Sequence, residues 1–155
     1  MKNITEKAYA KINISLDVTG RRPDGYHEML MVMQSVTLCD EVTITLTEGA
    51  RSCAECNLHF VPGDERNLAV RAANRFFERA GIDNTGAHIV LKKNIPVGAG
   101  MAGGSTDAAA VLRGLNKLTG AKLSSAELHE LAAEIGSDVA ICKAGAHSLP
   151  PAEAR

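Results

Sequence analysis

The chain contains no tryptophan and few other aromatic residues, two Tyr and three Phe among its 155 residues. Neither sign of charge is in excess, because 17 basic side chains stand against 18 acidic ones. A protein that binds nucleic acid or an anionic membrane normally has a basic surface, and binding of single strands also uses aromatic side chains for stacking. We therefore expect no nucleic acid and no membrane among its partners.

Long hydrophobic runs and a cysteine framework are also absent. The densest apolar segment, Met29–Met33, is much shorter than a membrane-spanning helix, and residues 1–16 lack the continuous apolar core of a signal peptide. Four scattered cysteines are too few for a disulfide-framed secreted protein. These absences predict a cytoplasmic protein with reduced thiols.

Two small clusters have simple structural interpretations. Cys53 and Cys56 with His59 resemble part of a zinc site, but no second pair of ligands lies nearby in the sequence, so we expect no metal there. The three methionines within residues 29–33 alternate along an expected strand, which favours packing in the core.

The remaining composition is that of a folded domain, with 45% hydrophobic and 23% charged residues. A single domain of this length buries enough surface to be stable without metal or disulfides.

The first half of the chain predicts β-structure, because apolar residues alternate with polar ones over Ala8–Val18, Met29–Val36 and Glu41–Leu46. We expect the polar segment Thr47–Asn57 to be a surface loop.

The second half predicts helices. A helix capped by Asn67 is expected to end near Gly81, and a short strand over Ala87–Leu91 follows. Two further helices are expected over Ser105–Leu118 and from the capping box at Ser124 to Ile135. The order of strands, helix, strand and two helices predicts an α+β fold.

A glycine-rich loop between the expected strand Ala87–Leu91 and the next helix is the most informative segment. Four glycines lie within the seven residues from Gly98 to Gly104, and glycine permits positive φ and close approach of the backbone to a ligand. The free N–H groups of the following helical turn attract anions. Hydroxyls at Ser105 and Thr106 suit phosphate oxygens or phosphate-bound Mg²⁺. The loop predicts a nucleoside triphosphate site, although a flexible connector would have a similar composition.

The loop is neither a Walker motif, since no Gly-Lys-Ser/Thr follows, nor a dinucleotide fingerprint, since no parallel βαβ repeat surrounds it. The residues that we expect to contact ATP are Pro96, Val97, Gly98, Ala99, Gly100, Met101, Ala102, Gly103, Gly104, Ser105 and Thr106.

Four motifs occur together in a fixed order: Ala10–Asn13, Arg22–Glu28, Pro96–Asp107 and Gly136–Val139. Together they resemble the 4-diphosphocytidyl-2-C-methyl-D-erythritol kinase family of the GHMP kinase superfamily. Such glycine loops are shared across the superfamily, whereas Arg-Pro-Asp-Gly-Tyr-His points to this one family. The resemblance implies an N-terminal ATP-binding domain with two layers, a β-sheet and helices, as in certain ribosomal proteins. It also implies ATP-dependent phosphorylation of a tertiary hydroxyl of the cytidine-linked substrate in non-mevalonate isoprenoid biosynthesis, with ATP and Mg²⁺ as cofactors.

The resemblance also assigns roles to single residues. Asp138 matches the base that takes the proton of the substrate hydroxyl, and Lys11 matches the lysine beside it, whose charge keeps the carboxylate ionised. Asn13 matches a residue that orients the hydroxyl, and Tyr26 and His27 match residues that hold the cytosine. Taken singly, each has a simpler explanation, such as a helix-end carboxylate, a strand lysine facing water or a loop side chain on the surface.

Two departures from the family pattern change what we expect. Ala102 replaces a glycine, which costs roughly 1 kcal/mol if that position needs a positive φ. Family members are nearly twice as long and add a second domain that closes over the substrate. We therefore expect this chain to lack the C-terminal domain, to turn over little or no substrate, and to self-associate through the apolar face left uncovered.

The last residues lead to a separate hypothesis. We assign residues 1–145 to the ATP-binding domain and residues 146–155 to an atypical tail. A shifted reading frame after Leu149 would restore the next segment of the family, so we hypothesise a one-base deletion there, which sequencing of the source gene tests.

Other interpretations remain open. Another GHMP-type kinase, such as one for mevalonate or homoserine, would lack cytidine contacts at Tyr26 and His27. A non-catalytic, nucleic-acid-associated module of similar architecture would bind RNA in a salt-dependent way without binding ATP. An inert fragment would do neither.

Overall fold

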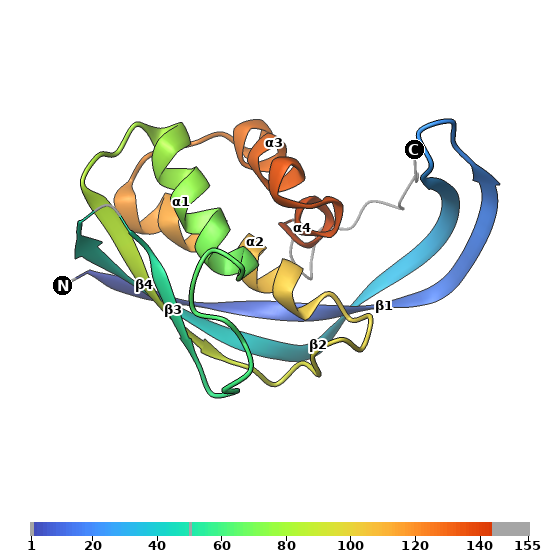
Figure 1. Ribbon diagram of the computed structural model, residues 1–155, viewed down its shortest axis with the longest axis horizontal. Coiled ribbons are helices and arrows are strands. Elements are labelled where there is room, and N and C mark those ends of the chain that lie inside the picture. The colour runs from blue at the N-terminus through green and yellow to red at the C-terminus, as the bar shows by residue number, and fades with distance from the viewer. Residues whose placement is uncertain (1, 50, 144–155) are drawn as a thin grey trace.

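A four-stranded sheet with helices on one face forms the molecule in the computed structural model, which describes residues 2–49 and 51–143 (Figure 1). The strands are β1 (Asn3–Arg21), β2 (His27–Glu48), β3 (Cys53–Cys56) and β4 (Thr85–Lys92). The helices are α1 (Leu68–Ala80), α2 (Gly103–Thr119), α3 (Ser125–Ile135) and α4 (Ser137–Lys143). The sheet order is β1-β2-β4-β3, with β3 and β4 parallel and the other pairs antiparallel. The expected α+β fold with two layers is confirmed.

The hairpin of β1 and β2 is longer than the sequence pattern predicts. We expected separate strands over Met29–Val36 and Glu41–Leu46, but β2 runs through both without interruption. Pairing with β1 continues across the break in the pattern because a register shift between Tyr9 and Lys11 absorbs it. In Figure 1 the far part of the hairpin extends beyond the helices and bends toward their side of the sheet.

The prediction that the three methionines of residues 29–33 pack in the core is wrong. Met29 is exposed, and Met31 and Met33 are only half-buried. They lie on the part of the hairpin that none of the described helices covers (Figure 1). Apolar neighbours there are exposed too, among them Ile14 at 63% and Val18 at 60%. Alternation in the sequence therefore identified the strand but not what covers it.

The expected loop over Thr47–Asn57 is also wrong, because it contains β3. This short edge strand pairs with β4, and the N–H of Ala54 donates to the carbonyl of Gly63 at 2.9 Å. Ala54 and Cys56 pack against the core, while Cys53 and Glu55 face outward. A strand of four residues with one apolar face of Ala and Cys has too weak a pattern to be recognised.

The caps of two helices follow the sequence closely. Asn67 caps α1 by accepting from the N–H of Ala69 at 2.9 Å, and Gly81 ends it with φ 65°. Ser124 and Glu127 form the expected capping box of α3. Helix α2 begins at Gly103, two residues before the expected start, and α4 was not expected. The hypothesis about the tail at residues 146–155 lies outside the described residues.

None of the helices formed by the described residues is both long and apolar enough to cross a membrane.

Candidate functional site

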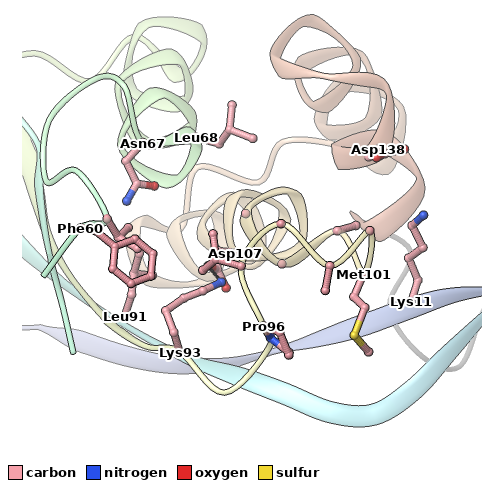
Figure 2. Close-up of a pocket in the computed structure, with 18 of the residues that line it drawn as sticks. Lys11, Phe60, Asn67, Leu68, Leu91, Lys93, Pro96, Met101, Asp107 and Asp138 are labelled. Carbon is pink, nitrogen blue, oxygen red and sulfur yellow. Dashed lines mark hydrogen bonds and ion pairs between the residues drawn. The ribbon is translucent and has the colours of Figure 1, made fainter. Parts of the chain in front are cut away.

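A pocket of about 590 Å³ opens where the glycine loop meets the start of α2 (Figure 2). That volume falls within the roughly 300–1,000 Å³ of typical small-molecule sites. The loop from Pro96 to Gly104 forms its middle. One end is mainly apolar and is lined by Phe60, Val61, Pro62, Leu68 and Leu91. The other end is polar and is lined by Lys11 and Asp138, and also by Asn13, which is hydrogen-bonded to Lys11.

The loop backbone is left-handed at three positions. Gly98, Gly100 and Ala102 have φ of 75°, 73° and 57°. Alternating left-handed residues turn successive peptide N–H groups toward one side, which makes a concave surface for an anion. The carbonyl of Met101 accepts from the N–H of Lys11 at 3.2 Å, so the loop is fixed to β1.

The start of α2 differs from the starts of α1 and α3. No side chain among the described residues caps it, whereas Asn67 and Ser124 cap the other two helices. The first intrahelical bond runs from the N–H of Thr106 to the carbonyl of Ala102 at 2.8 Å. The helical N–H groups before it are those of Gly103, Gly104 and Ser105, and the two glycines line the pocket. An uncapped helix start at a pocket is suited to phosphate or carboxylate.

The two residues expected to be catalytic, Lys11 on β1 and Asp138 on α4, lie at the same end of the pocket (Figure 2). Lys11 Nζ donates to Asn13 Oδ1 at 3.3 Å, which brings the third predicted residue beside them. Asp138 is in the first turn of α4, where the positive helix end stabilises a carboxylate. The hairpin and the last described helix thus bring together residues that are far apart in the sequence.

The thiol of Cys142 lies close to the same pair of charges. Burial raises its pKa to about 11, and the negative charge of Asp138 adds to this rise. Lys11 and a hydrogen bond with Thr106 partly offset it. Such a thiol stays protonated at neutral pH and is a poor nucleophile.

The remaining predicted residues are placed differently. Thr106 is buried against Cys142 and Ser105 is half-buried, and neither is among the described residues that line the pocket. Tyr26 and His27 lie at the tip of the hairpin, outside the pocket lining, and Tyr26 is 74% exposed. The structure therefore brings Lys11, Asn13, Asp138 and the loop together, but not the two residues expected to hold a cytosine.

A model of the GHMP kinases N-terminal domain matches residues 67–146, which is just over half of the chain. The chain belongs to the GHMP kinase family. This assignment agrees with the family expected from the motifs and with the two-layer fold.

Proteins that are named more specifically than the family are also similar to this chain. The 4-diphosphocytidyl-2-C-methyl-D-erythritol kinase of Bacillus velezensis is 54% identical over 147 residues, 94% of this chain and 50% of the relative. A crystal structure of 4-(cytidine 5'-diphospho)-2C-methyl-D-erythritol kinase is 34% identical with a TM-score of 0.74, and the match covers 96% of this chain and 55% of that one. Homoserine kinase from Cytophaga hutchinsonii, 22% identical with a TM-score of 0.66, shares the fold over 87% of this chain and 41% of its own. The chain spans about half the length of the relatives it matches.

This GHMP kinase domain has a buried ionic cluster beside the loop that the sequence analysis missed. Lys93 Nζ donates to Asp107 Oδ2 at 2.7 Å and to Asp40, and all three side chains are almost fully buried. Lys93 and Asp107 also line the pocket. A signal was present, because Lys93 continues the inward phase of Ala87, Ile89 and Leu91 along β4.

Two carboxylates share one ammonium in this cluster, and the titration of Asp107 is shifted. Burial raises the pKa of Asp107 to about 8, and the charge of Asp40 adds to the rise while Lys93 opposes it. Asp107 Oδ1 is the single buried side-chain nitrogen or oxygen of the described residues without a hydrogen-bond partner. A protonated Asp107 leaves one ammonium and one carboxylate, so the cluster is then neutral.

We predict that Ala102→Gly stabilises the domain by about 1 kcal/mol, because it removes the penalty of a left-handed alanine. Urea unfolding measures this change. Ala99→Gly is the matched control in the same loop, since Ala99 is not among the residues with positive φ, and it should be neutral or destabilising. Equal effects of the two changes would contradict the prediction.

We predict that Asp107 makes stability fall as pH rises. The folded domain keeps a proton on Asp107 up to about pH 8, whereas the unfolded chain loses it near the ordinary value of 3.8. Between those values the folded state binds more protons, so the free energy of unfolding declines with pH. Asp107→Asn removes this contribution, and the wild type should lose stability relative to it between about pH 5.5 and about pH 8.5.

Urea unfolding at the two pH values measures the difference. Asp64→Asn is the control, because exposed Asp64 has a lowered pKa and stays ionised in both states over this range. A wild type whose stability runs parallel to that of Asp107→Asn would show that Asp107 does not hold the proton.

Proposed function

We propose that this domain binds ATP, with the base at the apolar end of the pocket and the phosphates on the glycine loop. The observation that carries the proposal is the uncapped start of α2, which opens into a pocket that also holds Lys11 and Asp138. Apolar side chains such as Phe60 and Leu91 suit a purine, while free N–H groups suit phosphates. Along the pocket, an apolar surface is followed by an anion site and then by a charged end. This order matches the base, the phosphates and the reacting γ-phosphoryl group of ATP.

The reaction that we propose is transfer of the γ-phosphoryl group of ATP to an alcohol. Asp138 takes the proton of the alcohol while the alcohol oxygen forms a bond to the γ-phosphorus, and the bond from that phosphorus to the bridging oxygen breaks, so that ADP leaves. The Lys11 ammonium offsets negative charge on the transferring group, and Asn13 orients the hydroxyl. The domain contributes mainly positioning and electrostatic stabilisation.

The alcohol that we propose is the tertiary hydroxyl of 4-diphosphocytidyl-2-C-methyl-D-erythritol. The motif Arg-Pro-Asp-Gly-Tyr-His and the similarity to relatives named for this reaction support it. Tyr26 and His27 would hold the cytosine from the tip of the hairpin, which bends toward the helical side of the sheet (Figure 1). In this proposal residues 1–145 form the ATP-binding domain. We propose that the protein acts in the cytoplasm.

Mg²⁺ fits the oxygen donors of the site. No group of three or more His, Cys, Asp or Glu side chains in the described part of the chain is arranged for a metal ion. Mg²⁺ bound to phosphates needs few protein ligands and keeps several waters. The hydroxyl of Ser105, which follows the pocket-lining Gly104 in the first turn of α2, would hold it together with the phosphate oxygens. Bound there, the ion would neutralise charge on the phosphates.

Titration with Mg-ATP followed residue by residue by NMR tests nucleotide binding. We predict that amide signals of residues 97–104 shift, whereas those at the hairpin tip shift with a cytidine diphosphate ligand. Amide signals of the loop that do not shift when ATP is added would contradict the proposal. Salt-dependent RNA binding without ATP binding would favour the nucleic-acid-associated alternative.

Transfer is tested in a hybrid that joins residues 1–143 to the remaining half of the Bacillus velezensis relative. In this hybrid Asp138→Asn should lower kcat by about 10²–10⁴-fold, since the carboxylate acts only as the proton is removed. Glu134→Gln, which changes an exposed carboxylate near the end of α3, should leave kcat within about twofold, as expected for a residue outside the site. The chain alone should release little ADP, and normal substrate-dependent turnover would refute that part.

We also propose that the exposed apolar part of the hairpin drives self-association. Cross-strand pairs such as Leu16 with Met31 and Val18 with Met29 place apolar side chains on one face. Sedimentation velocity should show a mass that rises with concentration, and Ile14→Glu combined with Val18→Glu should abolish the rise. Val90→Glu, on exposed β4 surface, is the control. A wild type that stays monomeric at every concentration would disprove self-association.

A further inference from the structure

The buried cluster of Lys93, Asp40 and Asp107, called the Lys93 cluster below, joins the two ends of the glycine loop. Lys93 directly follows β4 and precedes the loop, and Asp107 follows the loop in α2. Their side chains meet at 2.7 Å, and the Lys93 ammonium also contacts Asp40 of β2. In Figure 2 Lys93 and Asp107 lie between the apolar end of the pocket and the charged end.

The backbone that enters the loop is held by the same cluster. Asp40 Oδ1 accepts from the N–H groups of Asn94 at 2.6 Å and Ile95 at 2.8 Å. The side chain of Asn57 accepts from the N–H of Lys93 at 2.7 Å and donates to its carbonyl at 3.2 Å. Three consecutive residues ahead of the loop are therefore fixed by side-chain hydrogen bonds.

The backbone that leaves the loop rests on the Lys93 ammonium. A Cβ added to Gly103, the first residue of α2, would lie 3.1 Å from Lys93 Nζ. The ammonium thus packs directly beneath the uncapped helix start while it holds Asp107 one turn further on. Between these fixed ends, the loop contains three left-handed residues and one backbone bond to β1.

We propose that Lys93 is a positioning residue, which Asp40 and Asp107 hold beneath Gly103 so that the loop keeps its anion-binding shape before a nucleotide arrives. Lys93 acts on nucleotide binding through the loop and not by contact with the nucleotide. An ordered loop avoids the entropic cost of fixing its backbone when the ligand binds. This inference rests on the proposed nucleotide-binding role of the loop.

Hydrogen–deuterium exchange without nucleotide and ATP titration test the role on the full chain. Lys93→Met keeps the aliphatic stem but removes the ammonium. We expect exchange at residues 97–104 to rise about tenfold or more, with no comparable change in the β1–β2 hairpin. We expect ATP affinity to fall by about tenfold, the effect of losing hydrogen bonds to charged groups.

Lys92→Met is the matched control for this change. Lys92 is the last residue of β4 and directly precedes Lys93, but its side chain points outward and pairs with exposed Glu41 at 3.7 Å. Neither loop exchange nor ATP affinity should change in this variant. Reduced ATP affinity with unchanged loop exchange in Lys93→Met would show direct contact with the nucleotide and overturn the proposal. Increased exchange throughout the domain with unchanged affinity would show a merely structural role and overturn it as well.

A second pair of variants keeps the test valid if Lys93→Met does not fold. Asp107→Asn retains an oxygen for the Lys93 ammonium and mimics the protonated carboxyl, so it should preserve loop protection. Asp107→Ala removes the partner and should raise loop exchange. Equal exchange in these two variants would refute the role of the cluster.

Failure of this inference is distinguishable from failure of the proposed function. A wild type that does not bind ATP would end the proposed function, whereas loop exchange in the absence of nucleotide would still report on the cluster.

Discussion

Close approach of α2 to the sheet is the constraint on which the site depends. A Cβ added to Gly114 in the middle of α2 would lie 2.5 Å from the Cδ1 atom of Ile44 on β2. Ala110, four residues earlier and so on the same side of the helix, is fully buried, so a second small side chain continues along this side. Helix α2 can therefore lie close to the sheet, and its start reaches the end of β4 and the middle of β1. With larger residues along this contact, the glycine loop would have to bridge a wider gap.

Electrostatics at the helix start follow from this placement. The uncapped N–H groups of α2 and the Lys11 side chain give the pocket positive character, while Asp138 adds a carboxylate at one end. The Lys93 cluster lies beneath them, and protonation of Asp107 keeps it neutral. If Asp107 were ionised, the cluster would carry one net negative charge, which would repel the phosphates that the loop is suited to bind.

Several features could be predicted because they depend on neighbouring residues. The caps at Asn67 and Ser124 follow from local backbone chemistry, and the structure has them where the sequence placed them. Edge strand β3 and the unbroken β2 could not be predicted in the same way. Their formation depends on pairing with β4 and β1, and a bulge absorbs the mismatch that looked like a strand end.

The features of the site can be separated in the same way, into those that follow from the sequence and those that depend on the tertiary structure. By itself the sequence determined the glycine loop, its hydroxyls and the motif residues Lys11, Asn13 and Asp138, because these follow from residue types in a recognisable order. Only the tertiary structure decided which of them share a pocket, that Tyr26 and His27 lie apart from it, and that Lys93 is buried between Asp40 and Asp107. Such neighbours are set by strand register and helix packing, which connect residues from distant parts of the chain.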